Sequence, residues 1–203
     1  MSKKADKHLS KDPIMKMIVK EHQKLSLPKS KTVFHELVKS IVYQQISIKA
    51  AETIHNRLIK FLGTDDFLPE DLLLYSYDEL KSVGLSKQKT NYIINIGNYF
   101  VENHIEESDW ESMSDEEILE KLVSIKGVGE WTVQMILIFQ LDRQDVLPVK
   151  DLAIQQTMVK LYNIKSEKSK LLKDMVKVAE PWRPYRSIAS LYLWAWKRAS
   201  RKE

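Results

Sequence analysis

Residues 122–136, LVSIKGVGEWTVQMI, join two apolar helical runs through a short loop that contains two glycines. The 203-residue chain has only five glycines, yet Gly127 and Gly129 stand one residue apart in this loop. Glycine adopts positive φ angles at no steric cost and lets other groups approach the backbone closely. We therefore predict a hairpin of two helices over about residues 122–140. Its second helix, EWTVQMILIFQL, is nearly all apolar and should be buried.

The loop KGVG is compatible with two roles. The second helix starts there with backbone N–H groups that lack acceptors inside the helix, and these amides and the helix dipole favour an anion. A phosphodiester could bind without any base-specific contact, and Lys126 would add a cation. A tight corner, in which the glycines serve only close packing of two helices, explains the same pair.

Helical signals continue on both sides of the hairpin. Apolar residues in FHELVKSIVYQQ recur at i, i+3, i+4, i+7 and i+8, the spacing of one helix face. Ser47 and Gly63 are placed to cap the two ends of the next helix, and Ser114 and Glu117 have capping-box spacing. No segment shows strand alternation with hairpin turns. The sequence predicts an all-α fold of about ten helices.

Composition excludes several kinds of chemistry. The chain has 32 Lys and Arg against 28 Asp and Glu, so any affinity for nucleic acid must depend on where the charges lie. It has no cysteine, which excludes disulfides, cysteine-ligated zinc, iron–sulfur clusters and thiol catalysis. The five histidines show no metal-ligand spacing. We expect no signal peptide in the polar N-terminus, and the apolar runs are too short to span a bilayer.

Several segments together resemble the helix–hairpin–helix DNA glycosylase superfamily. The tryptophan after GVGE and the stretch DVLPVKDLAI are similar to its 3-methyladenine DNA glycosylase II branch. Three more segments resemble the early helix pair, a middle helix and the last helix of that branch: FHELVKSIVYQQISIKAA, VGLSKQKTNYI and PWRPYRSIASLYLWAW. The likeness covers residues 12–200.

The resemblance implies two interlocked helical lobes, with the N-terminal segment returning to pack against the last helices. We assign residues 1–11 to a flexible basic segment and residues 12–203 to the helix–hairpin–helix glycosylase domain. Members of this branch often carry an additional N-terminal β-rich domain. We expect no such domain here, because 203 residues leave no room for it.

Asp151 lies between LPVK and LAIQQ, where a helix is predicted to begin. From the residues alone, capping that helix is a sufficient explanation for the aspartate. The resemblance places the catalytic aspartate of the family at this position. A carboxylate there could stabilise the oxocarbenium-like sugar that forms as an N-glycosidic bond breaks, and it needs no metal or redox cofactor. For Arg183 and Arg186, near the start of the last helix, we expect a structural role rather than DNA contact.

The residue type at position 131 indicates whether the enzyme is a monofunctional or a bifunctional glycosylase. In the bifunctional relatives a lysine at this position forms a Schiff base with the sugar and permits strand cleavage. Trp131 cannot do so, and neither Lys126 nor Lys150 occupies the matching position. We expect a monofunctional DNA glycosylase that removes alkylated purines such as 3-methyladenine from duplex DNA after base flipping. A non-catalytic helix–hairpin–helix DNA-binding protein and a bifunctional glycosylase/lyase are the alternatives.

The resemblance also implies a base pocket formed by Trp131, Met135 and Trp194. Aromatic faces suit an alkylated purine, because its ring is cationic. Packing in the core is an equal explanation for Met135 and Trp194. A pocket tyrosine that follows the last tryptophan in the branch is Ala195 here, so the range of bases stays open.

Gln45 lies between two predicted helices, where relatives insert a side chain into the gap left by the flipped base. Without the family likeness, a polar helix end explains this glutamine. The predicted DNA-binding residues are Gln45, Lys126, Gly127, Val128 and Gly129.

No cofactor is expected, although similar hairpins hold a monovalent cation on backbone carbonyls. The carbonyls that would hold it here belong to Val123, Ile125 and Val128. The predicted partner is damaged double-stranded DNA, with no membrane and no obligatory protein partner. For a prokaryotic source we expect a cytoplasmic, nucleoid-associated protein.

Overall fold

The computed structural model describes residues 3–22 and 32–200, and these are helices joined by turns and loops. Thirteen α-helices and one short 3-10 helix, without any strand, make up the regular structure of these residues, which confirms the all-α prediction. The helices beyond the expected ten are the two at the N-terminus and a single turn at Asp109–Ser112. No helix within the two described ranges combines the length and apolar character needed to cross a bilayer.

The chain divides into two compact units. Residues 29–141 form one unit, and residues 1–28 together with residues 142–203 form the other. The N-terminal segment therefore packs with the last helices of the chain, as predicted.

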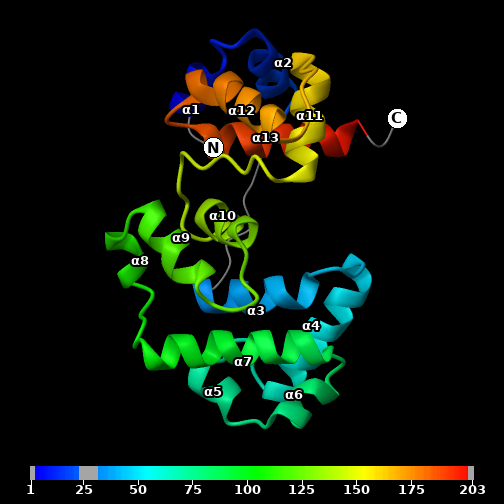
Figure 1. Ribbon diagram of the computed structural model, residues 1–203, viewed down its shortest axis with the longest axis vertical. Coiled ribbons are helices and arrows are strands. Elements are labelled where there is room, and N and C mark those ends of the chain that lie inside the picture. Colours follow the sequence, from blue (N-terminus) through cyan, green and yellow to red (C-terminus); the bar gives the residue numbers. More distant parts are fainter. Residues whose placement is uncertain (1–2, 23–31, 201–203) are drawn as a thin grey trace. The chain divides into compact units, whose positions relative to one another are not determined.

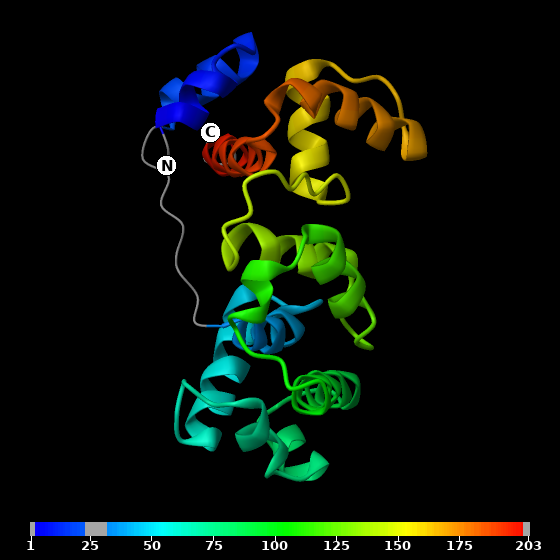
Figure 2. The same ribbon diagram turned by 90° about the vertical axis from the view of Figure 1, so that its left-hand side faces the viewer.

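The unit of residues 29–141 contains the hairpin. Within it, α7 packs against α3, and α5 and α6 lie on the other side of α7 (Figures 1 and 2). The predicted apolar face of α3 is buried, including Phe34, Leu37 and Ile41. Its helices are α3 (Val33–Tyr43), α4 (Ile48–Leu62), α5 (Pro69–Leu73), α6 (Tyr77–Ser82), α7 (Lys87–Glu102), α8 (Asp109–Ser112), α9 (Asp115–Val123) and α10 (Glu130–Phe139).

The predicted helix ends in this unit are confirmed. The Ser47 side chain accepts the N–H of Ala50 at the start of α4, and Gly63 ends that helix with φ of 77°. Ser114 and Glu117 form a reciprocal capping box at the start of α9. Each such cap contributes about 1 kcal/mol by satisfying backbone groups that the helix leaves unpaired.

The other unit is organised around its last helix, α13. Eight of its residues between Ser187 and Ala195 are buried, and the helix packs against α11 and α2 (Figure 1). Its helices are α1 (Lys3–Leu9), α2 (Pro13–Glu21), α11 (Leu152–Tyr162), α12 (Lys168–Ala179), η1 (Glu180–Trp182) and α13 (Arg186–Ala199).

The N-terminal segment corrects one prediction. Residues 1–11 were expected to be a flexible basic segment, but residues 3–9 form α1, whose Ala5 and Leu9 are buried. The Tyr192 hydroxyl donates a hydrogen bond to Asp6 Oδ1 at 2.8 Å, which ties α1 to α13. Ala5 and Leu9 are four residues apart, so a buried helical face is present in this charged segment. Residues 1 and 2 lie outside the described residues.

Asp12 connects α2 to the rest of the same unit through hydrogen bonds. Its Oδ1 accepts the N–H groups of Ile14 and Met15 and so caps α2. Its Oδ2 accepts hydrogen bonds from the Tyr162 hydroxyl at 2.9 Å and from Trp182 Nε1 at 3.0 Å. Burial of Tyr162 and the neighbouring Asp12 charge raise the pKa of the phenol far above its ordinary value, so it remains a hydrogen-bond donor.

Candidate functional site

The hairpin loop connects α9 to α10 and uses its two glycines differently. Gly127 has a φ of 110°, a conformation that favours glycine. A Cβ atom added to it would lie 2.3 Å from Cγ of Tyr92, so the backbone rests directly against that ring. Gly129 has an ordinary φ of −103°, and a Cβ atom there would meet nothing within 4 Å. The two roles proposed for the pair therefore belong to different glycines. Gly127 permits close packing of the helices, whereas Gly129 leaves space in which a ligand could approach the backbone.

Two amide side chains hold the loop from neighbouring helices. Gln44 Nε2 donates to the carbonyl of Gly127 at 3.3 Å, and Asn95 Nδ2 donates to the carbonyl of Lys126 at 3.4 Å. Gln44 follows α3, and Asn95 lies one helical turn after Tyr92 on α7. Gln44, Tyr92 and Asn95 were not among the residues predicted from the sequence. The pair of glutamines at 44 and 45 was visible, but nothing in it distinguished their roles.

The start of α10 has no capping side chain. Its N-cap residue is Gly129, which cannot accept hydrogen bonds from the first turn through a side chain. Amides at an uncapped helix start, together with the helix dipole, favour an anion. Lys126 is exposed beside this turn, whereas Val128 is only 5% exposed. Contact of Val128 with DNA stays a prediction.

The predicted cation ligands lie in the same loop. The carbonyl of Ile125 already accepts the N–H of Val128 at 3.0 Å, which leaves it one lone pair. Val123 is the last residue of α9. Neutral carbonyl oxygens of this kind suit a hard cation. The assignment of these three carbonyls to a monovalent ion stays a prediction.

Trp131 and Met135 lie one turn apart on α10. The prediction that this helix is buried holds for five of its residues, Thr132, Val133, Ile136, Leu137 and Ile138. Trp131 is different, because 45% of its surface is exposed. Exposure of so large an apolar side chain beside the open loop favours ligand contact over packing in the core. Met135 is half-buried.

Gln45 lies in the turn between α3 and α4 and is exposed. Its φ is 56°, which is uncommon for a residue with a side chain. Ile46 in the same turn and Ile48, the first residue of α4, are 39% and 70% exposed. The turn and the helix start therefore present one amide and two apolar side chains to solvent, which is a composition suited to insertion between stacked bases.

Asp151 is the N-cap residue of α11, as predicted. Its Oδ1 accepts the N–H of Ile154 at 2.9 Å and also the indole Nε1–H of Trp194 at 3.0 Å. Trp194 comes from α13, so two helices fix the position of one carboxylate oxygen. Asp151 and Trp194 are each half-buried. The carboxylate is therefore oriented by the protein and remains partly accessible.

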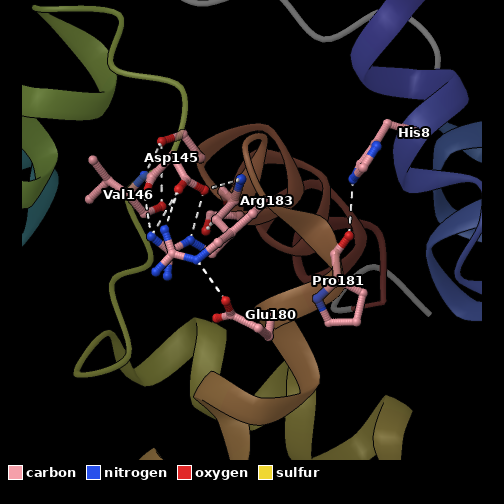
Figure 3. Close-up of polar contacts among 9 residues, drawn as sticks. His8, Asp145, Val146, Glu180, Pro181 and Arg183 are labelled. Atoms are coloured by element: carbon pink, nitrogen blue, oxygen red, sulfur yellow. Dashed lines mark hydrogen bonds and ion pairs between the residues drawn. The ribbon is translucent and has the colours of Figure 1, made fainter.

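The segment that leads to Asp151 is fastened to the start of α13. Arg186 Nε donates to Asp145 Oδ1 at 2.8 Å. Arg183 Nη1 donates to Asp145 Oδ2 at 2.6 Å (Figure 3). Arg183 also donates through Nε to Glu180 Oε1 at 3.0 Å (Figure 3). The N–H of Val146 donates to the Ser187 hydroxyl at 2.8 Å. Both arginines therefore pair with carboxylates, which agrees with the expected structural role.

The predicted site residues fall into both units. Asp151 and Trp194 are brought together in the unit that holds α11 and α13. Trp131, Met135, Gln45 and the hairpin loop belong to the unit of residues 29–141. A base pocket that joins Trp131 and Met135 to Trp194 therefore stays a prediction.

Comparisons with known proteins show the family of the chain. Residues 38–183 match the family model described as HhH-GPD superfamily base excision DNA repair protein. A DNA-3-methyladenine glycosylase of Schizosaccharomyces pombe is 32% identical over 81% of this chain and 72% of its own length. The chain also spans 66% of the length of a Bacillus subtilis relative that is 30% identical to it.

Solved structures show the same fold. The crystal structure of a DNA-3-methyladenine glycosidase from Bacillus halodurans has a TM-score of 0.87 and 32% identity, and the match covers 100% of this chain and 92% of that one. The structure of the Schizosaccharomyces pombe 3-methyladenine DNA glycosylase in complex with abasic DNA has a TM-score of 0.80 and 31% identity, covering 94% and 95%.

The family model and these relatives show that the chain is a DNA repair glycosylase of the helix–hairpin–helix class. The chain belongs to the HhH-GPD superfamily of base excision DNA repair proteins, and within it to the 3-methyladenine DNA glycosylase family.

Proposed function

We propose that this protein is a monofunctional DNA glycosylase that hydrolyses the N-glycosidic bond of alkylated purines such as 3-methyladenine in duplex DNA. Membership of the family supports this activity, and so do relatives named as DNA-3-methyladenine glycosylases. One of these relatives has been solved with abasic DNA, the product state of base removal. Damaged double-stranded DNA is therefore the proposed substrate.

The observation that carries the proposal is the double hydrogen bond at Asp151. Oδ1 receives the N–H of Ile154 and the indole N–H of Trp194, from two different helices. Capping of α11 requires only the first of these donors. The second donor has no part in the helix start, and it fixes the direction of the carboxylate. Such preorganisation is what electrostatic stabilisation of a developing cation requires.

The reaction follows from the charge of the substrate. As the C1′–N bond breaks, its electron pair leaves with the base, and positive charge develops on the sugar. For a cationic alkylated purine this electron pair neutralises the ring, so the leaving base needs no proton. The Asp151 carboxylate would stabilise the oxocarbenium-like sugar, and water would then add its oxygen to C1′ and release a proton to solvent. The base would have to leave the stack first.

Trp131 supports the monofunctional subtype. Its indole nitrogen is not a nucleophilic amine, so it cannot form the Schiff base on which lyase chemistry depends. We infer that Trp131 instead stacks on the extruded base. Borohydride treatment of the protein with damaged DNA tests this inference, because a glycosylase/lyase yields a covalent adduct whereas a monofunctional enzyme yields none.

The decisive experiment measures the bases released from DNA that carries mixed damage, by mass spectrometry. We expect release of alkylated purines by the parent protein and none by Asp151→Asn. Asparagine can still cap α11 and accept both hydrogen bonds, so this variant should fold and bind DNA. Asp142→Asn, an exposed change in the same unit, is the matched control and should release bases as the parent does. Binding without base release by the parent would instead support a non-catalytic DNA-binding protein.

A further inference from the structure

A polar groove lies beside the hairpin, in the unit of residues 29–141. It has a volume of about 660 Å³. Its lining residues are Lys87, Gln88, Asn91, Tyr92, Asn95 and Lys126. Two of them are cationic, three are amides, and no carboxylate is among the described residues that line it. Each lining side chain can donate a hydrogen bond, which is the complement of a phosphate group, because phosphate only accepts.

The groove is continuous with the hairpin loop. Tyr92 lines the groove, and its ring also packs against the backbone of Gly127. The Gln88 side chain donates to the Tyr92 hydroxyl at 2.5 Å, and Asn95 donates to the carbonyl of Lys126. The groove side of α7 and the loop therefore form one connected surface. A strand held by the hairpin amides would lie next to the groove.

The lysines near the groove differ in whether their ammonium groups are available to bind phosphate. Lys89 Nζ donates to the carbonyl of Val42 at 2.8 Å, and burial lowers the pKa of its ammonium group. Lys89 therefore serves the structure of the unit. Lys87 and Lys126 are exposed and line the groove itself, one on α7 and one on the hairpin loop.

The other end of α7 shows the opposite charge. A second hollow of about 480 Å³, beyond the C-terminal half of α7, is lined by four acidic side chains among its fourteen residues, Asp66, Glu70, Glu106 and Glu107. Two histidines also line it, but no lysine or arginine among the described residues does, so it suits a polyanion less well than the groove. The charge contrast along one helix directs a nucleic acid strand to the N-terminal half of α7, at the hairpin.

We propose that this groove is a second phosphate subsite, which extends the grip of the hairpin along one DNA strand by at least one nucleotide. The proposal rests on the proposed function, because DNA is the ligand in both. Lys87 and Lys126 neutralise the phosphate, and the amides of Asn91 and Gln88 donate to its oxygens. The contact carries no sequence information, which suits a protein that must scan all sequences for damage.

The salt dependence of DNA binding tests the subsite. Affinity for an undamaged duplex is measured by fluorescence anisotropy from low to moderate salt, for the parent protein, Lys87→Gln and Lys60→Gln. The last variant is the control, because Lys60 is an exposed lysine of the same unit that lines a different hollow. Loss of one phosphate contact should make the negative slope of log K against log salt shallower by about 0.9 in Lys87→Gln. Equal slopes for Lys87→Gln and the control would overturn the proposal.

Neutral methylphosphonate linkages locate the contact. Placed singly along one strand, they should weaken parent binding at the hairpin phosphate and at a neighbouring phosphate. Lys87→Gln should lose its response only at the neighbour. If inorganic phosphate competes with duplex in the parent but no single linkage matters, the groove binds a free anion and the strand subsite is wrong. These readouts need no base release, so a protein inactive on methylated DNA would refute the proposed function and leave this test intact.

Discussion

The indole Nε1 of Trp194 lies 3.0 Å from Oδ1 of Asp151 and donates a hydrogen bond to it. The two residues are 43 positions apart in sequence and belong to different helices, α13 and α11. The same oxygen accepts the N–H of Ile154 in the first turn of α11. The candidate catalytic carboxylate is therefore positioned by a residue that family resemblance assigns to the base pocket.

Trp194→Phe separates these two roles, because phenylalanine keeps an aromatic face and loses the N–H donor. We expect base release under single-turnover conditions to slow about 10- to 100-fold, since a hydrogen bond to a charged group contributes about 1.5–3 kcal/mol. Trp196→Phe, on the same helix and half-buried, is the control and should keep the parent rate. An unchanged rate in Trp194→Phe would leave stacking or packing as the only role of Trp194.

The two hairpin glycines should respond differently to alanine. Gly127→Ala would place Cβ 2.3 Å from the Tyr92 ring at a φ of 110°, so we expect a loss of stability of more than about 2 kcal/mol in urea denaturation. Gly129→Ala adds a methyl group in open space at an ordinary φ, so stability should change by about 1 kcal/mol or less. Its DNA affinity should fall, because the methyl group stands where we expect a phosphate. Parent-like affinity in Gly129→Ala would exclude that position for the phosphate.

Gln45→Gly tests insertion into the duplex. The φ of 56° at this residue suits glycine, so folding should be preserved. We expect less base flipping, measured as a smaller fluorescence rise from a 2-aminopurine next to the lesion site. Gln44→Ala is the contrasting variant: it removes the bond to the carbonyl of Gly127 and should lower stability by about 1 kcal/mol. Normal flipping in Gln45→Gly would assign insertion to another residue of the turn.

The two arginines on Asp145 should differ in their contribution to stability. The Arg186 side chain is 14% exposed and donates to both carboxylate oxygens, whereas the Arg183 side chain is 48% exposed. Arg186→Ala should lower the free energy of unfolding by about 2–3 kcal/mol, because a charged hydrogen-bonding group loses its partner. Arg183→Ala should cost less, because solvent screens its ion pair. Equal losses would show that exposure does not rank these two contacts.

The lowered pKa of His55 should make the stability of the protein depend on pH. Burial on α4 lowers its pKa, and the nearby Lys39 charge lowers it further. The unfolded chain, with an ordinary histidine pKa of about 6.5, then binds a proton before the folded protein does. Stability should therefore fall as pH drops below about 6.5 and level off below the folded pKa. Urea denaturation between pH 7.5 and 5 should show a shallower decline in His55→Asn, and an identical decline in both proteins would contradict the assignment.

Interactions within one helical turn could be predicted from the sequence. Ser47, Ser114 and Glu117 cap helices through partners three residues away, and such contacts depend on local backbone geometry alone. The same holds for Asp151 at the start of α11. The exact need for Gly127 could not be predicted, because the Tyr92 ring that excludes a side chain belongs to another helix.

By itself, the sequence determined the all-α fold, the hairpin, the helix ends and the position of the aspartate, because periodicity and caps act over a few residues. The tertiary structure decided which groups meet across long separations: Trp194 with Asp151, Gln44 with the hairpin loop, and Tyr192 with Asp6 in a segment expected to be flexible. These contacts depend on how the helices of each unit pack together. A helical pattern says which face of a helix is buried, but it does not say which residue of another helix that face will meet.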